Sequence, residues 1–459
     1  MSSSSFFGDM LQSISDRGRQ LLDLTRKRGP DAVTRSADFV VLCEDLLSGR
    51  GEASGVALAR EILTRYSTLT IGPRIAFFEA LAQRFGPDRD RMQSAIEAWQ
   101  KKPNDETAAE VHEAAEPRRQ ELFRRLNLAP GGTAALVRMR EHLLDAMPHR
   151  PDLSVVDADF VHLFSSWFNR GFLVLRDIDW ATPANILEKI IQHEAVHKIR
   201  SWDDLRRRID PPDRCCFAFF HPALYDEPLI FVEVALTDEL PGAIGPILAA
   251  KRETMDKDDV DTAVFYSISN CQRGLAGVSF GNFLIKQVVE EVSRENPKLK
   301  RFVTLSPVPG FASWLKRERH SGASRALTQE DIDALANLDT DGWWQVPETR
   351  EPVEEPLMRA AAWYFLHARN SRGFPADPVA RFHLGNGARL EQMHFLADGS
   401  ENGIRQSYGL MVNYLYDLDD IEKNHEAFAE NRMVVASNAV RKLARPGPTG
   451  DVVPLASKV

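Results

Sequence analysis

TAVFYSISNCQRGLAGVSFGNFLIKQVVEEV, residues 262–292, contains the three consecutive elements that decide the fold. Residues 262–269 are rich in aromatic and branched side chains and predict a strand. A glycine-rich turn follows at 270–281, and residues 283–292 carry apolar side chains at helical spacing. Such a turn directs backbone N–H groups and the positive end of a helix dipole toward an anion such as a pyrophosphate. We therefore expect a mixed α/β domain with an anion-binding loop.

The segments before and after the glycine-rich turn limit which class of phosphate-binding loop it can belong to. Residues 214–221 and 228–236 predict a hairpin before the first strand, and residues 301–306 predict a strand after the helix. The glycine spacing and the antiparallel hairpin do not fit a dinucleotide-binding fold, and Lys286 is not in the context of a Walker loop. Gln272-Arg-Gly-Leu-Ala-Gly277 loosely fits the coenzyme A loop of acetyltransferase-like folds. The alternative is a tight turn that requires only small residues.

The first third of the chain has a different pattern. Apolar residues recur at helical spacing in residues 31–47, 55–69, 71–85 and 136–147, with Gly or Pro between the segments. Short connections favour antiparallel neighbours in a bundle. We expect an α+β protein, with an all-α helical bundle domain at residues 1–155 followed by a mixed α/β catalytic domain at residues 156–459.

Composition and charge exclude several classes of protein. The 459 residues carry a net charge of -9, and the first 150 are nearly neutral, with 22 Lys and Arg against 21 Asp and Glu. Nucleic acid is an unlikely partner for such a chain, because its binding needs a dominant positive field. No apolar run reaches the ~18 residues of a membrane span. Four cysteines without CxxC spacing, and an N-terminus unlike a secretory signal, lead us to expect a cytoplasmic protein.

The segment His193-Glu-Ala-Val-His197 matches a short zinc-binding pattern. Two histidines four residues apart share a face of a helix, and residues 184–199 are compatible with a helix. However, no third ligand follows at the spacing that zinc proteases use. We therefore expect no metal site, and an ordinary helix end with His197 near the negative end of the helix dipole.

Two further segments carry candidate catalytic groups. Thr304-Leu-Ser-Pro-Val-Pro-Gly-Phe311 ends a strand with Ser306 before a Pro-x-Pro turn, and Asp377-Pro-Val-Ala-Arg-Phe-His-Leu-Gly-Asn-Gly-Ala388 places His383 in a turn-rich stretch. A serine and a histidine so far apart in sequence are weak evidence of a pair, because a chain of this length offers many such combinations.

Taken together, these segments resemble the malonyl-CoA decarboxylase family. The resemblance spans most of residues 160–416, and several independent motifs occur in the same order. The matching stretches are Trp167–Leu173, Glu194–His197 with Asp204–Arg208, Tyr266–Ser269 through Gln272–Gly281, Leu305–Phe311, Asp377–Ala388 and Gly409–Tyr414.

The resemblance implies an acetyltransferase-like (GNAT-type) catalytic domain that converts malonyl-CoA to acetyl-CoA and CO2 without a cofactor. It maps the catalytic serine onto Ser306 and the catalytic histidine onto His383, which would donate a proton to the enolate while Ser306 orients the carboxylate. It maps the substrate-binding loop onto Ala276, Gly277, Val278, Ser279, Phe280, Gly281 and Asn282. Ser279-Phe280 departs from the Glu-Leu expected of animal members, which puts individual loop contacts in doubt.

The same reading predicts neighbours, partners and alternatives. Asn386, Asn413 and Tyr414 are expected beside the catalytic pair, and Arg273 and Lys286 are candidate cations for the coenzyme. A homodimer or homotetramer built through the helical domain is what the family suggests. Two alternatives stay open: an acyl-CoA-dependent acyltransferase that uses the same loop, and a non-catalytic acyl-CoA-binding scaffold.

Overall fold

The computed structural model describes residues 32–48, 52–278, 284–321 and 324–444. The chain divides into two compact units. The first, which we call the helical unit, consists of Met1–Val174, His221–Glu227 and Gln272–Phe280; the second, the sheet unit, consists of Leu175–Phe220, Pro228–Cys271 and Gly281–Val459. The N-terminal part of the glycine-rich loop thus belongs to the helical unit, although the strand before it and the helix after it belong to the sheet unit.

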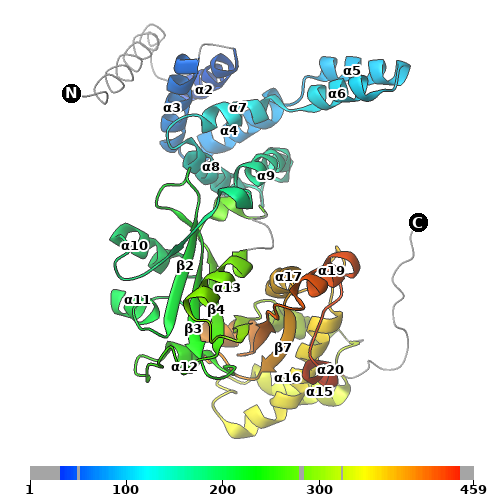
Figure 1. Ribbon diagram of the computed structural model, residues 1–459. Coiled ribbons are helices and arrows are strands. Elements are labelled where there is room, and N and C mark those ends of the chain that lie inside the picture. The colour runs from blue at the N-terminus through cyan, green and yellow to red at the C-terminus, as the bar shows by residue number, and fades with distance from the viewer. Residues whose placement is uncertain (1–31, 49–51, 279–283, 322–323, 445–459) are drawn as a thin grey trace, which may run out of the picture. The chain divides into compact units, whose positions relative to one another are not determined.

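The helical unit is built from short helices joined by Gly, Pro and capping residues (Figure 1). The helices are α2 (Ala32–Leu47), α3 (Glu52–Ser67), α4 (Ile71–Arg84), α5 (Arg89–Lys101), α6 (Asp105–Ala115), α7 (Arg118–Asn127), α8 (Gly132–Ala146) and α9 (Ser154–Trp167), with single 3-10 turns at Pro151–Leu153, Arg170–Phe172 and Arg273–Leu275. The four segments predicted as helices are confirmed. The predicted domain boundary between residues 155 and 156 falls inside α9.

A buried ion pair ties three of these helices together. Arg119 on α7 and Asp159 on α9 are both buried and form an ion pair through Nε, and Gln120 also donates to the Asp159 carboxylate at 2.5 Å. Arg119 reaches the carbonyl of Leu81 on α4 at 3.5 Å. Buried charges are tolerated only when they are paired and hydrogen-bonded. The pair therefore fixes the relative positions of α4, α7 and α9.

The sheet unit is organised around a mixed sheet (Figure 1). The described strands form one eight-stranded sheet in the order β1-β2-β3-β4-β5-β8-β6, with β7 paired to β8. Their bounds are β1 (Val174–Asp177), β2 (Arg214–Phe220), β3 (Pro228–Thr237), β4 (Thr262–Asn270), β5 (Arg301–Thr304), β6 (Ser306–Pro307), β7 (Arg389–His394) and β8 (Met411–Leu415). β2, β3 and β4 are antiparallel, whereas β4 and β5 are parallel. The predicted hairpin and the predicted strands are confirmed.

Helices cover both faces of this sheet and connect its strands. They are α10 (Ala184–His193), α11 (Trp202–Ile209), α12 (Ile244–Leu248), α13 (Leu284–Glu295), α14 (Phe311–His320), α15 (Gln329–Leu335), α16 (Pro347–His367), α17 (Pro378–Gly385), α18 (Glu401–Ser407), α19 (Ile421–Asn431) and α20 (Asn438–Leu443), with a 3-10 turn at Ala336–Asp339. α13 is the crossover between the parallel strands β4 and β5, a connection that parallel pairing requires.

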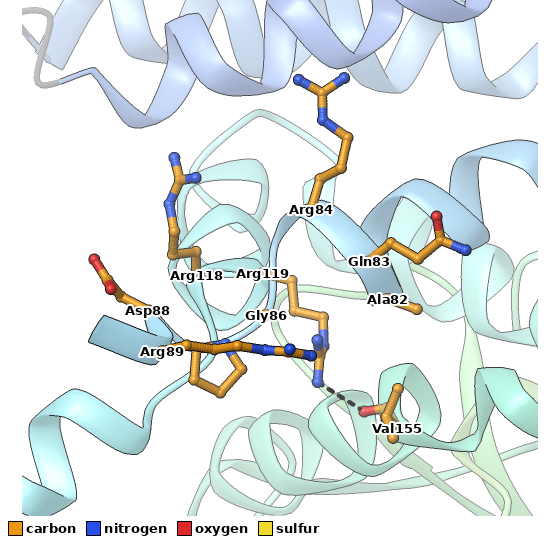
Figure 2. Close-up of a pocket in the computed structure, with 10 residues that line it drawn as sticks. Ala82, Gln83, Arg84, Gly86, Asp88, Arg89, Arg118, Arg119 and Val155 are labelled. Carbon is orange, nitrogen blue, oxygen red and sulfur yellow. Dashed lines mark hydrogen bonds between the residues drawn. The ribbon is translucent and has the colours of Figure 1, made fainter. Parts of the chain in front are cut away.

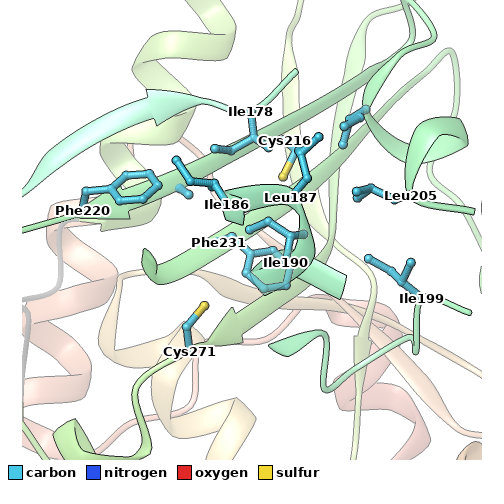
Figure 3. Close-up of a cluster of buried hydrophobic side chains, with 12 residues drawn as sticks. Ile178, Ile186, Leu187, Ile190, Ile199, Leu205, Cys216, Phe220, Phe231 and Cys271 are labelled. Carbon is cyan, nitrogen blue, oxygen red and sulfur yellow. The ribbon is translucent and has the colours of Figure 1, made fainter. Parts of the chain in front are cut away.

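One face of the sheet is closed by α10 and α11. Figure 3 shows the cluster, in which Ile186, Leu187 and Ile190 of α10 and Leu205 of α11 pack on Cys216 and Phe220 of β2 and on Phe231 of β3. Each large apolar side chain buried here contributes roughly 1.5–3 kcal/mol relative to exposure. A second cluster, which includes Val264, Tyr266, Val303, Leu305 and Met411, lies further along the sheet. Strand residues that point to the opposite face, such as Phe219 and Val232, are also buried. The sheet is thus buried on both sides.

The predicted helix over residues 184–199 is wrong in its second half. α10 ends at His193, and Glu194 adopts an extended conformation. The Glu194 carboxylate folds back to accept the backbone N–H groups of Val196 at 2.8 Å and His197 at 2.6 Å, which offers these groups an alternative to helical hydrogen bonds. His193 and His197 therefore do not share a helix face, because His197 lies beyond the last residue of α10.

Candidate active site

Ser306 is positioned by the end of the sheet. β5 and β6 follow each other with one residue between them, and both pair with β8, through Val303 with Leu415 and Ser306 with Val412. Because side chains alternate along a strand, Thr304 and Ser306 point to the same side. Their hydroxyl oxygens lie 2.8 Å apart, and the Ser306 hydroxyl donates to Thr304 Oγ1. Both residues are buried.

His383 is positioned by α17, a helix of eight residues that begins at Pro378. Asp377 caps its N-terminus, because its carboxylate accepts the backbone N–H groups of Val379 and Ala380, each at 2.9 Å. Proline at the first helical position suits this geometry. His383 lies in the last turn and is 3% exposed.

The tertiary structure brings the two predicted catalytic residues together. Ser306 Oγ and His383 Nε2 are 3.2 Å apart, although 77 residues separate them in the sequence. The other ring nitrogen, Nδ1, lies 2.8 Å from the hydroxyl of Tyr416. Both nitrogens of the imidazole therefore have a polar partner, and the ring is held between a serine and a tyrosine.

Apolar and aromatic groups control the charge of His383. Its ring stacks on Tyr414 with a centroid distance of 4.6 Å and an interplanar angle of 23°. Burial lowers the pKa of His383 to about 3, because the charged ring would lose its hydration. At neutral pH the free protein therefore holds a neutral imidazole here. Burial also keeps the pKa of Tyr416 well above its usual value, so that its hydroxyl stays protonated.

The three residues predicted to lie beside the catalytic pair differ in their contacts. Tyr414 contacts His383 directly through the stacked rings. Asn413 lies further away: its amide donates to the Thr304 carbonyl at 2.8 Å and its oxygen lies 2.5 Å from His394 Nε2. Asn386 ends α17, and its amide donates to the Phe382 carbonyl at 2.7 Å. The backbone N–H of Asn386 donates to the His383 carbonyl at 3.1 Å, and among the described contacts its side chain has no hydrogen bond to the Ser306 or His383 side chain.

Sequence reasoning missed Thr304 and Tyr416. Each lies two residues from a residue that was singled out: Thr304 before Ser306, and Tyr416 after Tyr414. Two-residue spacing in a strand places side chains on one face. This periodicity was the available signal for Thr304. For Tyr416, which follows the end of β8, the contact with His383 depends on α17 and could not be read from the spacing.

The described part of the predicted substrate loop packs on α8 within the helical unit. Arg140 of α8 is 2% exposed and donates through one nitrogen to the carbonyls of Gly274 at 2.8 Å and Ala276 at 2.7 Å. Glu141 accepts the N–H of Gly274 at 3.2 Å. Ala276 and Gly277 are exposed, and Val278 is buried. Ser279, Phe280, Gly281 and Asn282 lie outside the described residues.

The two candidate cations both have acidic partners. Arg273 is exposed and forms an ion pair with Asp145 of α8 at 2.5 Å. Lys286 forms an ion pair with Glu422 of α19. Because each cation already pairs with a carboxylate, a coenzyme phosphate at either position would compete with that carboxylate.

The residues of the zinc-like pattern form a structural cluster instead. Glu194 Oε2 accepts the hydroxyls of Ser267 at 2.7 Å and Ser269 at 3.2 Å on β4. On the neighbouring strand β3, buried Glu233 lies opposite Ser267 and pairs with Arg208 at 3.2 Å. Within the described residues, no group of three or more His, Cys, Asp or Glu side chains is arranged to hold a metal ion. The cluster ties the segment after α10 to the sheet.

The helical unit also contains a cavity of about 350 Å³ that four arginines line, Arg84, Arg89, Arg118 and Arg119 (Figure 2). Arg118 pairs with Glu44 at 2.5 Å, and Arg119 donates to the Val155 carbonyl at 3.3 Å in addition to its pairing with Asp159. The lining contains no serine, cysteine, histidine, lysine or tyrosine. The one acidic group in the lining, Asp88, caps the N-terminus of α5 by accepting the backbone N–H groups of Asp90 and Arg91.

Two family models match most of the chain from residue 85 onward. Residues 85–168 match the malonyl-CoA decarboxylase N-terminal domain, and residues 171–452 match the malonyl-CoA decarboxylase C-terminal domain. The structure contains no helix long and apolar enough to cross a membrane within its described residues.

Relatives with names and structures agree with this match. The mitochondrial malonyl-CoA decarboxylase of Anser anser anser is 34% identical over 465 residues, which cover 94% of this chain and 88% of that protein. The mitochondrial malonyl-CoA decarboxylase of Rattus norvegicus is 33% identical over 433 residues, which cover 87% of this chain and 85% of that protein. The crystal structure of malonyl-CoA decarboxylase from Rhodopseudomonas palustris is 59% identical with a TM-score of 0.86, over 89% of this chain and 99% of that one. The crystal structure of malonyl-CoA decarboxylase from Agrobacterium vitis is 56% identical with a TM-score of 0.85, over 88% of this chain and 99% of that one. The chain belongs to the malonyl-CoA decarboxylase family.

Proposed function

We propose that the protein decarboxylates malonyl-CoA to acetyl-CoA and CO2, with Ser306 and His383 as the catalytic residues. Family membership supports the reaction. The observation that carries the residue assignment is the 3.2 Å contact between Ser306 Oγ and His383 Nε2 in a buried setting. The exposed backbone of Ala276 and Gly277, with the segment that follows to Asn282, is the proposed site for the coenzyme.

The chemistry needs few groups. The bond between the carboxylate carbon and the α-carbon breaks, CO2 leaves, and the electron pair passes to the thioester carbonyl to give an enolate. The thioester itself accepts these electrons, and for this reason we propose that no cofactor is required. The protein has to hold the carboxylate out of the plane of the carbonyl and then deliver a proton to the α-carbon. Ser306 is the proposed hydrogen-bonding partner of the carboxylate.

His383 is the proposed proton donor. Burial holds its pKa at about 3 in the free protein, so the ring is neutral before substrate binds. A bound carboxylate raises the pKa of a neighbouring histidine, because the negative charge favours the protonated ring. The ring then takes up one proton with the substrate and returns it from Nε2 to the α-carbon. The reaction consumes this proton, which balances the loss of the carboxylate charge.

An assay without an acyl acceptor separates this proposal from its alternatives. We expect CO2 release from malonyl-CoA alone, whereas an acyltransferase that uses the same loop would need an acceptor. Binding of malonyl-CoA without turnover would instead favour a scaffold.

His383→Asn tests the residue assignment. It should lower kcat by at least about 100-fold, the low end for general acid catalysis. His367→Asn, at the exposed end of α16, is the matched control and should retain activity. Near-normal turnover in a folded His383→Asn protein would refute the assignment.

The proposal also covers the type of the sheet domain, the oligomeric state and the cellular location. We propose that the sheet unit is an acetyltransferase-like (GNAT-type) domain; the order of hairpin, strand, loop, crossover helix and strand supports it. A homodimer or homotetramer stays a prediction, which light scattering would test. A cytoplasmic location is also proposed, because the four cysteines are free thiols, as expected in a reducing compartment.

A further inference from the structure

Thr304 contacts the catalytic pair through its hydroxyl group. It lies at the end of β5, is 0% exposed, and its Oγ1 accepts two hydrogen bonds. One comes from the Ser306 hydroxyl at 2.8 Å and the other from the backbone N–H of Tyr414 at 3.1 Å. The oxygen is therefore fixed by β8 on one side and receives the serine proton on the other.

The direction of these hydrogen bonds determines where His383 carries its proton. Ser306 has one hydroxyl proton, and it points to Thr304. Ser306 can then only accept from His383 Nε2 at 3.2 Å, so Nε2 must carry a hydrogen. A neutral imidazole has one N–H, which leaves Nδ1 as an acceptor for the Tyr416 hydroxyl at 2.8 Å. The contacts of Ser306 with Thr304, of His383 with Ser306 and of His383 with Tyr416 are thus consistent with one arrangement of the hydrogens.

We propose that Thr304 is a positioning residue that draws the Ser306 hydroxyl proton away from His383, so that the imidazole holds its transferable hydrogen on Nε2. The proposal rests on the proposed function, in which Nε2 delivers the proton to the α-carbon. When malonyl-CoA binds, the Ser306 proton turns from Thr304 to the substrate carboxylate, and in both positions the serine oxygen remains an acceptor for the Nε2 hydrogen of the neutral or the protonated ring. Without the Thr304 oxygen, the Ser306 hydroxyl would turn to donate to Nε2 and would displace the hydrogen to Nδ1.

A structural role alone predicts a different outcome. Threonine is common in strands, and its bond to the Tyr414 N–H stabilises the contact between β5 and β8 irrespective of catalysis. If that were its whole role, replacing the hydroxyl by a methyl group would lower stability but leave the histidine tautomer unchanged. The tautomer is therefore the decisive observable, and turnover is the second one.

The experiment compares Thr304→Val, Thr304→Ser and the parent protein. Protein labelled with ¹⁵N-histidine is examined by NMR near neutral pH, with the His383→Asn spectrum used to assign the His383 ring nitrogens. We expect the Nε2–H tautomer in the parent and in Thr304→Ser, and the Nδ1–H tautomer in Thr304→Val. In the acceptor-free assay, kcat of Thr304→Val should fall on the order of 100-fold, with KM changed by less than about threefold, and Thr304→Ser should restore most of kcat.

Thr262→Val is the matched control. Thr262 is equally buried, lies at the start of β4, and its hydroxyl donates to Asp261 at 2.8 Å, away from the pair. It should retain the parent tautomer and kcat. A parent with the Nδ1–H tautomer, or a Thr304→Val protein with unchanged tautomer and turnover, would overturn the inference. Should Thr304→Val fail to fold, Thr304→Ala, which also lacks the hydroxyl, takes its place with the same expected and contradicting outcomes.

Failure of the proposed function has a separate signature. A parent protein that releases no CO2 from malonyl-CoA would refute the function, while the NMR comparison would still show whether Thr304 sets the tautomer. Conversely, normal CO2 release with an unchanged tautomer in Thr304→Val would refute the role of Thr304 alone.

Discussion

At the scale of the residue, the central feature is an imidazole that the protein keeps neutral. A histidine in an unfolded chain has a pKa near ~6.5, whereas burial lowers the pKa of His383 to about 3. Between these values the unfolded chain binds more protons than the folded one. The stability associated with this residue is therefore fully present above pH 6.5 and is lost progressively as the pH falls toward 3.

His383→Asn should make the protein less sensitive to acid. At about pH 5 the parent should have lost about 2 kcal/mol of stability relative to about pH 7.5 through this histidine, and the variant should be spared that loss. Urea unfolding at the two pH values measures the difference. An equal acid sensitivity in the parent and the variant would show that His383 is not a buried neutral group.

At the scale of the element, the glycine-rich loop approaches α8 closely at Gly274. A Cβ atom added at Gly274 would lie 2.1 Å from the carbonyl oxygen of Val137, which is backbone and cannot move aside. Only glycine allows the loop to lie so near the helix. The carbonyls of Gly274 and Ala276 are then within reach of Arg140.

Gly274→Ala should therefore displace the loop. We expect the KM for malonyl-CoA to rise on the order of tenfold, with a smaller change in kcat, because the substitution affects binding and not the catalytic pair. Gly245→Ala on α12 is the control, since nothing lies within 4 Å of the added Cβ. Unchanged kinetics in a folded Gly274→Ala protein would argue against a role of the loop in substrate binding.

The elements also show where sequence patterns succeed. Strands and helices with long periodic stretches were predicted correctly, because a buried face repeats every two or about 3.6 residues. α10 was predicted too long. The chain after His193 leaves the helix because Glu194 bonds to the backbone and to Ser267 and Ser269 of β4, and periodicity carries no information about such a contact.

At the scale of the whole molecule, the net charge limits how a polyanionic coenzyme can be attracted to the protein. The net charge of -9 gives no general positive field for a polyanion. Arg273 and Lys286 already have carboxylate partners. We therefore propose that binding depends on backbone donors at short range, which salt screens much less than it screens distant charges.

We expect the KM for malonyl-CoA to change by less than about threefold between about 50 and 200 mM NaCl, because no distant charges attract the substrate. Steady-state kinetics over this range measure it, and the same series with potassium chloride controls for effects of the cation. A rise of tenfold or more with salt would show that long-range attraction governs binding after all.

The sequence by itself determined four helices of the first third, the four strands between residues 214 and 306, the helix between the last two of them, and the motifs that carry Ser306 and His383; β1, β7 and β8 were not predicted. It could do so because burial imposes local periodicity and because the motifs are contiguous. Only the tertiary structure decided that these two residues meet, that Thr304 and Tyr416 complete their hydrogen bonds, and that the first part of the loop packs with α8 in the helical unit. These contacts join residues from separate strands and helices, and they exist only after the sheet has brought β5, β8 and α17 together.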